Sequence, residues 1–200
     1  MNIKLKDLRK NQIMRAAEEV VIAKGYDQSR VDDIVKKSKL SKGAIYWYYN
    51  SKKEIYLSLV DHWFVEYSNG LQNIIEKETA PSNQLKLLFN YFFEQFRKNP
   101  STFKILVEFW RMSGLDSDFN LKLQDVYSHF LKYITDIIIQ GIAIGEFKKV
   151  EPKITALSIL INIEGIHWFT LFNEPKVEAN EYINTISDFI LNGLKKKKIK

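Results

Sequence analysis

The 200-residue sequence contains no cysteine and has only three histidines, four prolines and eight glycines. Without cysteine there are no disulfides, no thiolate-bound metals and no cysteine nucleophile, which fits a reducing compartment. No stretch approaches the roughly 20 consecutive apolar residues of a membrane-spanning helix, and charges interrupt the N-terminus where a secretion signal would be apolar. We therefore expect a cytoplasmic protein without a membrane partner.

The signatures of common catalytic sites are also missing. The three histidines, His62, His129 and His167, fall in separate segments without the spacing of a metal site. There is no Gly-x-Ser-x-Gly motif, no phosphate-binding loop and no dinucleotide fingerprint. We therefore predict no catalytic residues, no metal site and no cofactor, and we do not expect an enzyme.

The charge is distributed unevenly along the chain. Residues 1–53 hold 13 Lys and Arg against 6 Asp and Glu, residues 54–194 hold 12 against 18, and the last six residues include five lysines. A basic first quarter on an acidic body favours a polyanion partner for that quarter. Charge alone leaves the alternative of solvated surface charge open, and the lysine tail is either a solvated end or an auxiliary DNA contact.

Apolar residues recur at helical spacing along the chain, so the expected fold is all-α with about nine helices. A helix is expected from residue 8 to about 25, short helices are expected after Ser29 and Ser41, and another helix from residue 51 to about 77. Ser29 with Asp32, and Ser51 with Glu54, have the spacing of a capping box. The prolines then separate segments expected to be helical at about 82–98, 101–113, 117–143, 152–172 and 176–194.

The two short helices have the properties of a helix-turn-helix, whose second helix enters the major groove of DNA. Ile45 and Tyr49 lie four residues apart on a face that is expected to pack. Tyr46, Trp47 and Tyr48 spread over about 200° of a helix, so they cannot all be core. The alternative is a small helical subdomain whose aromatic side chains only fill its interior.

Several side chains in this segment suit DNA contacts. Lys42 can reach guanine or a phosphate, and Ala44 can touch a thymine methyl group. Gly43 permits a close approach of the backbone, and Lys52 is expected to hold a phosphate across the groove. The residues expected to contact DNA are Ser29, Arg30, Ser41, Lys42, Gly43, Ala44, Tyr46, Trp47, Tyr48 and Lys52.

One pattern of residue types spans residues 8–57. Its positions are Ile13, Ala16, Ala17, Gly25, Tyr26, Ser29, Val31, Ile34, Leu40, Ser41, Lys42, Gly43, Ile45, Tyr46, Tyr48, Tyr49, Ser51, Lys52 and Glu54. In these positions the segment resembles the N-terminal DNA-binding domain of TetR-type (TetR/AcrR) transcriptional regulators. Departures from the family pattern include Lys39, where glycine is usual, Arg30 and Ala44, where threonine is frequent, and Trp47 at the variable reading position. The resemblance implies a three-helix DNA-binding domain (residues 1–50) and a helical ligand-binding and dimerisation domain (51–200).

The last two expected helices are richer in apolar residues than peripheral helices need to be. Such an excess is usually covered by a partner, and a symmetric dimer is the commonest solution; burial within one chain is the alternative. The resemblance implies that these helices pair with those of a second copy. The residues expected at the dimer interface are Leu157, Ile161, Trp168, Ile183, Ile186, Phe189 and Ile190.

An aromatic-rich segment at residues 88–110 has a helical stripe that fits either an ordinary core helix or the wall of an apolar effector cavity. Regulators of this family respond to drugs, aromatic compounds, fatty acids or acyl-CoA thioesters, so the resemblance implies a small hydrophobic effector. The candidate effector residues are His62, Trp63, Glu66, Phe89, Phe92, Phe93, Phe96, Phe109, Trp110, Arg111 and His129.

The expected function is therefore a homodimeric repressor that binds a pseudo-palindromic double-stranded DNA operator. A small hydrophobic effector, such as a fatty acid, an acyl-CoA or a drug-like aromatic compound, would release it. The alternative is a nucleoid-type protein that binds DNA without sequence preference and without an effector.

Overall fold

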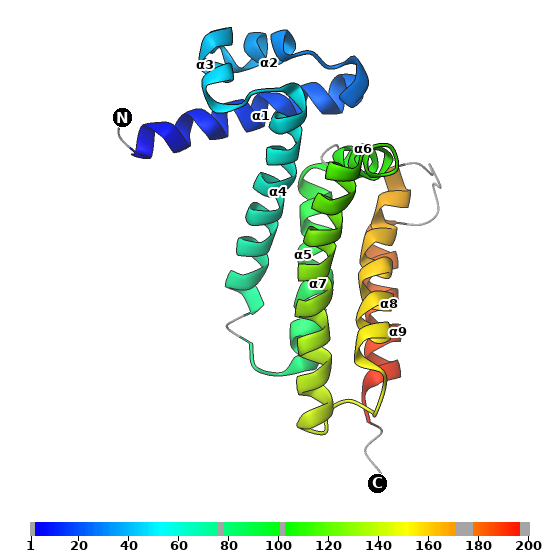
Figure 1. The fold of residues 1–200 in the computed structure, drawn as a ribbon. Helices are drawn as coiled ribbons and strands as arrows, with labels where there is room; N and C mark the ends of the chain where they lie inside the picture. The colour runs from blue at the N-terminus through cyan, green and yellow to red at the C-terminus, as the bar shows by residue number, and fades with distance from the viewer. Residues whose placement is uncertain (1–2, 76–77, 101–102, 171–177, 197–200) are drawn as a thin grey trace. The chain divides into compact units, whose positions relative to one another are not determined.

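The computed structural model describes residues 3–75, 78–100, 103–170 and 178–196 (Figure 1). Apart from one isolated antiparallel bridge between Phe147 and Lys195, the regular structure in these residues is helical, which confirms the all-α prediction. None of the described helices has the length and hydropathy needed to cross a membrane. The elements are α1 (Ile3–Gln28), α2 (Val31–Ser38), α3 (Lys42–Tyr48), α4 (Lys52–Ile75), α5 (Pro81–Lys98), α6 (Phe103–Ser113), α7 (Ser117–Ala143), α8 (Pro152–Glu164), the 3₁₀ helix η2 (Gly165–Thr170) and α9 (Ala179–Leu194).

The chain divides into two compact units. The first comprises residues 1–67 and 104–124, and the second comprises residues 68–103 and 125–200. The first unit therefore holds α1, α2, α3 and most of α6, with the beginnings of α4 and α7. The second holds α5, α8, η2 and α9 with the remainder of α4 and α7. The functional division expected between residues 50 and 51 stays a prediction.

Helix α1 begins earlier than expected and is interrupted near its end. It starts at Ile3 instead of residue 8, so the basic N-terminal segment is helical. Gly25 breaks the helical geometry with a φ of 71°, a left-handed conformation that glycine adopts without a Cβ clash. The chain turns there towards α2, which confirms that Gly25 ends the regular helix.

The first turn of α2 is capped by residues adjacent to the expected pair. Arg30, not Ser29, is the N-cap residue, and its backbone N–H donates to the carboxylate of Asp33 at 3.0 Å. The Ser29 hydroxyl instead donates to the Tyr26 carbonyl at 2.6 Å. The predicted capping box of Ser29 and Asp32 was therefore wrong by one residue, because Ser29 is taken up by the preceding turn.

Helices α3 and α4 begin where their serines predict. The Ser41 hydroxyl accepts the Ala44 N–H, and the Ser51 hydroxyl accepts the Glu54 N–H, each at 3.1 Å. Ile45 is buried, as its position in the apolar stripe predicts. Figure 1 shows α1 running beneath α2 and α3, and each of the three helices contributes a completely buried isoleucine, Ile13, Ile34 and Ile45.

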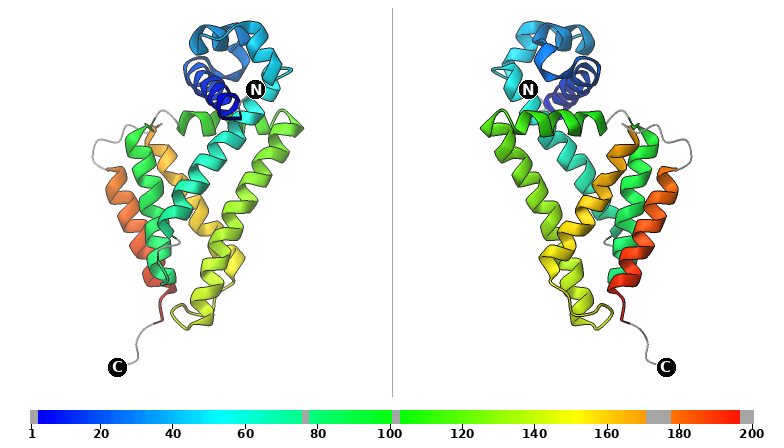
Figure 2. Two further views of the ribbon diagram at one scale, coloured as in Figure 1. Left: turned by 90° about the vertical axis from the view of Figure 1, so that its left-hand side faces the viewer. Right: turned by 90° about the vertical axis from the view of Figure 1, so that its right-hand side faces the viewer.

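In the second unit, α5 and α9 lie side by side (Figures 1 and 2). The ring of Tyr182 on α9 packs where a side chain at Gly165 would lie, and its hydroxyl donates to the Asn162 carbonyl at 2.9 Å. Gly165 is also where α8 ends and η2 begins. The single α-helix expected at 152–172 is therefore two elements as far as residue 170, and its last two residues lie outside the described part of the chain.

Candidate nucleic-acid interface

Helix α3 has one packed face and one exposed face. Ile45 is completely buried, whereas Tyr46 is 44% and Trp47 is 61% exposed. The Trp47 ring meets the Tyr48 ring edge to face at 4.6 Å between centroids. The Lys6 ammonium on α1 lies 5.9 Å from the centre of the Trp47 ring. These aromatic groups do not merely fill the interior, because two of the three present large surfaces to solvent.

Lys42, at the start of α3, forms an ion pair across the turn. Its ammonium lies 2.8 Å from the carboxylate of Asp32 on α2. The hydrogen bond and the charge of Asp32 raise the pKa of Lys42 above its usual value, because both favour the ammonium form. Asp32 was not among the expected site residues, because no sequence signal showed that its side chain meets Lys42.

The other residues expected on this face differ in their surroundings. Arg30, Ser41 and Gly43 are exposed, and Ala44 is partly exposed. Apart from the neighbouring residues and the backbone of α3 itself, no described atom lies within 4 Å of the position that a Cβ on Gly43 would take, so this part of the α3 surface is open. Ser29 is buried and donates to a backbone carbonyl, so its side chain does not face solvent.

Lys52 was expected to hold a phosphate, but its ammonium forms hydrogen bonds within the first unit. It donates to the carbonyls of Tyr26 and Ser29 at 2.9 and 3.1 Å, and it lies 4.3 Å from the centre of the Tyr26 ring. Charged hydrogen bonds and a cation–π contact together favour this position. The geometry therefore indicates that Lys52 positions residues 25–30, which run from the break at Gly25 to the start of α2 and are called the segment between α1 and α2 below.

Two charged residues of α6 also bind the segment between α1 and α2. The Glu108 carboxylate accepts the Tyr26 N–H at 2.5 Å and also two hydrogen bonds from Arg111 at 3.0 Å. The guanidinium of Arg111 additionally pairs with Asp27 at 2.8 Å. Arg111 was expected to contact an effector, whereas here it holds Asp27 and Glu108 together. We call Tyr26, Asp27, Glu108 and Arg111 the α6 brace.

Residues at the start of α7 contact α4 and the same segment. The Lys53 ammonium lies 2.7 Å from the carboxylates of both Asp116 and Asp118, which raise the pKa of Lys53 well above its usual value. The Phe119 ring meets the Tyr26 ring edge to face at 5.4 Å. The first turns of α4 and α7 are thus fixed to the segment that leads into α2.

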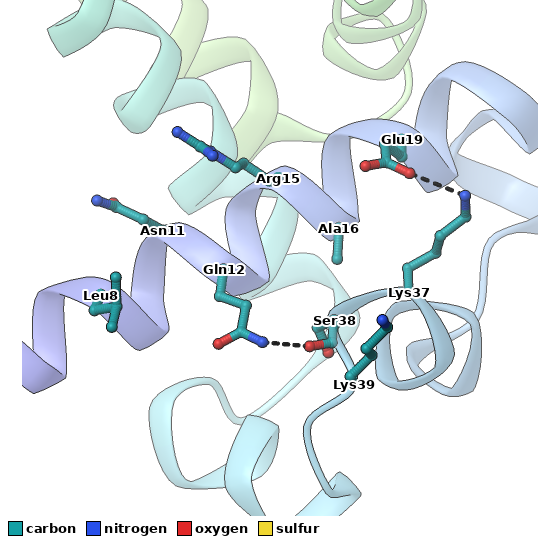
Figure 3. A pocket seen from close by; sticks show the side chains of 9 residues that line it. All are labelled: Leu8, Asn11, Gln12, Arg15, Ala16, Glu19, Lys37, Ser38 and Lys39. Carbon is teal, nitrogen blue, oxygen red and sulfur yellow. Dashed lines mark hydrogen bonds and ion pairs between the residues drawn. The ribbon is translucent and has the colours of Figure 1, made fainter.

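The first unit also has an open hollow of about 450 Å³ between α1 and the end of α2 (Figure 3). The Lys37 ammonium pairs with Glu19 at 2.9 Å, and the Gln12 amide donates to the Ser38 carbonyl at 2.5 Å, so these bonds tie the last turn of α2 to α1. The lining residues are Leu8, Asn11, Gln12, Arg15, Ala16, Glu19, Lys37, Ser38 and Lys39. Because all of these residues except Leu8 and Ala16 are polar or charged, the hollow does not match the apolar cavity expected for the effector.

The candidate effector residues are divided between the two units. Phe89 and Phe109 are buried, as core residues would be, while the side chains of Glu66 and His129 are largely exposed. The described residues contain no group of three or more His, Asp or Glu side chains that could hold a metal ion. The first unit holds His62, Trp63, Glu66, Phe109, Trp110 and Arg111, and the second holds Phe89, Phe92, Phe93, Phe96 and His129. The effector assignment stays a prediction.

Glu164 in the second unit was missed by the sequence analysis. Burial raises the pKa of its carboxyl group to about 7, although a hydrogen bond from Tyr127 favours the ionised form. Its isolated position at the end of an apolar stretch gave no sequence signal.

The second unit exposes apolar side chains where a dimer interface is expected. Phe189 on α9 is 74% exposed, whereas Ile183 on the same helix is only 1% exposed and belongs to the core of its own unit. Ile186 and Ile190 are partly exposed. The other exposed members of the expected set are Leu157, Ile161 and Trp168. Ile183 is therefore not available to a partner.

Comparisons with known proteins agree with this geometry. The family described as "Bacterial regulatory proteins, tetR family" matches residues 13–59. The chain is 23% identical to the fatty acid metabolism regulator protein of Bacillus subtilis over 187 residues, covering 93% of this chain and 95% of that protein. It is also 23% identical to the regulator QacR of Staphylococcus aureus over 196 residues, covering 94% and 98% respectively.

Solved structures share the whole fold. The transcriptional regulator FadR from Bacillus subtilis, in complex with stearoyl-CoA, superimposes with a TM-score of 0.82 at 22% identity, covering 91% of this chain and 97% of that one. At this identity the likeness shows the fold. Residues 13–59, which include the exposed helix α3, therefore match the tetR family of bacterial regulatory proteins, and the chain shares the fold of a solved transcriptional regulator.

Proposed function

We propose that the protein is a homodimeric repressor that binds a pseudo-palindromic operator and is released by a small hydrophobic effector. The observation that carries the DNA-binding part is the division of α3 into a buried face at Ile45 and an exposed face at Tyr46 and Trp47. A short helix anchored from behind in this way is suited to lie in the major groove. The protein would act in the cytoplasm, where the operator DNA is.

The exposed polar and aromatic groups have complementary roles in this proposal. Lys42 and Arg30 supply positive charge to phosphates or base edges, and the Ser41 side chain adds a polar group to the same surface. Tyr46, Trp47 and Tyr48 can each donate one hydrogen bond while the ring packs against sugar. Gly43 keeps the backbone close to the groove, and Ala44 meets a thymine methyl group. Ser29 and Lys52 position this surface from inside.

Dimerisation is supported by the apolar side chains that α8, η2 and α9 expose, among them Leu157, Ile161, Trp168 and Phe189. Covering them with the same face of a second copy gives a twofold axis. A twofold pair of α3 helices about 34–36 Å apart reaches successive major grooves. This spacing is what the proposed operator symmetry requires.

A long-chain acyl group is the effector class that we propose to test first. The Bacillus subtilis relative is named for fatty acid metabolism, and the superimposable FadR structure contains stearoyl-CoA. The phenylalanines of α5 provide apolar surface in the second unit. The similarity to QacR makes a drug-like aromatic compound the second candidate.

The proposal can be tested by electrophoretic mobility shift with DNA from around the protein's own gene. A specific complex should survive a large excess of unrelated DNA and should dissociate when stearoyl-CoA is added. Free stearate and an aromatic cationic drug, tested separately, distinguish the effector classes. Equal competition by unrelated DNA would instead support the nucleoid-type alternative, and a complex that resists all three compounds would contradict the proposed effector classes.

A further inference from the structure

A carboxylate lies on the surface that the proposed function turns towards DNA. Asp32 belongs to the first turn of α2, and its side chain is 61% exposed, close to the 57% of Lys42 with which it pairs at 2.8 Å. Phosphates repel a carboxylate, so Asp32 weakens any contact that depends only on the DNA backbone. Its position beside the first cation of α3 suits a contact to a base edge instead.

The ion pair matches the hydrogen-bonding pattern of one kind of base pair. An ammonium only donates and a carboxylate only accepts. In the major groove, a G·C pair presents guanine O6 and N7 as acceptors beside the N4 amino donor of cytosine. O6 and N4 are joined by a Watson–Crick hydrogen bond and lie about 2.9 Å apart. This separation is close to the 2.8 Å between Lys42 Nζ and Asp32 Oδ1.

The other base pairs match less well. A T·A pair also places an acceptor, thymine O4, beside a donor, adenine N6. However, it presents a methyl group where Lys42 would find guanine N7, and it sets the acceptor N7 of adenine next to Asp32. In the reversed pairs, C·G and A·T, the Lys42 ammonium would face an amino donor and the Asp32 carboxylate would face an acceptor oxygen. G·C in one orientation is therefore the best partner.

We propose that Asp32 and Lys42 act together to select a G·C pair at one position in each operator half-site. Lys42 donates to guanine, and Asp32 accepts from the amino group of cytosine. The same ion pair holds Lys42 away from phosphates and so reduces binding to unrelated DNA. This inference rests on the proposed operator binding and adds a specificity-determining residue to it.

The test is selection of duplexes from a randomised pool by the full-length protein. Wild type, Asp32→Asn and Glu19→Gln are compared; Glu19 is a matched control, because it is exposed, pairs with Lys37 at 2.9 Å and loses the same charge. Wild type and Glu19→Gln should select one motif with a fixed G·C pair. Asp32→Asn should lose roughly 5- to 150-fold of the preference at that position, keep the other positions and bind unrelated DNA more tightly.

The outcomes separate this inference from the proposed function. If Asp32→Asn selects the same motif with undiminished discrimination, the paired reading is overturned while operator binding stands. If Glu19→Gln loses the preference equally, net charge explains the effect and the pairing is again overturned. If wild type selects no motif at all, operator binding fails and this inference fails with it.

Discussion

Replacing Glu108 with alanine should destabilise the segment between α1 and α2. Its carboxylate accepts the Tyr26 N–H, and its side chain is only 17% exposed. Truncation leaves this N–H without its acceptor in a partly buried place, which costs about 1–3 kcal/mol. Loss of the Arg111 contact adds little, because that guanidinium is partly exposed and still pairs with Asp27. We expect the free energy of unfolding to fall by about 2 kcal/mol.

Glu94→Ala is the matched control. Glu94 also pairs with an arginine three residues further on, Arg97, but both side chains lie on an exposed face of α5. Urea unfolding followed by circular dichroism should show a clear loss for Glu108→Ala and little change for Glu94→Ala. Hydrogen exchange of residues 25–30, followed by mass spectrometry, should accelerate only in Glu108→Ala. Equal losses in the two variants, or unchanged exchange, would refute the α6 brace.

The same carboxylate predicts a dependence on pH. Hydrogen bonds from Arg111 and from the Tyr26 N–H hold the pKa of Glu108 below its usual value of 4.5, against the opposing effect of burial. Because the pKa is lower in the folded state, the stabilisation is complete above the unfolded value and is lost as pH falls through the folded one. Glu108→Gln should therefore lose less stability than wild type between about pH 5 and pH 3. Parallel acid unfolding curves would contradict this assignment.

Three further substitutions test other parts of the molecule. Lys39→Gly should raise the free energy of unfolding by about 0.5–1 kcal/mol in thermal denaturation, because Lys39 has a left-handed φ of 56°; a loss would contradict this explanation. Lys52→Met should lower the melting temperature, because the partly buried carbonyls lose their donor, and should leave the salt dependence of DNA binding unchanged. If the slope of log K against log salt concentration instead falls by about 1, Lys52 contacts a phosphate. Phe189→Glu should yield monomers in analytical ultracentrifugation, while Leu121→Glu, also at an exposed position, should not; a dimeric Phe189→Glu protein would place the interface elsewhere.

Local patterns predicted the helices and the two faces of α3 well. Ile45 repeats the apolar stripe and is buried, Tyr46 lies outside that stripe and is exposed, and Ser41 caps the helix as its position suggests. Each of these features depends on residues within one or two turns of each other. Periodicity and capping therefore sufficed to locate α3 and its exposed face.

Long-range partners were beyond such patterns. Lys52 bonds the carbonyl of Tyr26, 26 residues earlier, and Arg111 bonds Asp27 in a different helix. A lysine at the start of a helix and an arginine near aromatic residues look the same in sequence whether they bind a ligand or a neighbouring segment. The fold alone decides between these roles.

The two apolar sides of α9 show a related difficulty. Ile183 and Phe189 both belong to a helix rich in apolar residues, and both were expected to meet a partner subunit. In the structure Ile183 is buried in its own unit and Phe189 is exposed. A helix that is apolar on both sides does not reveal which side packs within the chain.

The central claim is that the exposed face of α3 reads operator DNA, and Tyr46→Ala tests it most directly. Fluorescence anisotropy should be measured with the duplex that wild type selects from a randomised pool, in excess unrelated DNA. We predict tight binding by wild type at two protomers per duplex, and loss of that binding in Tyr46→Ala while its helix content and dimerisation are unchanged. Equally tight, sequence-selective binding by Tyr46→Ala would contradict the account.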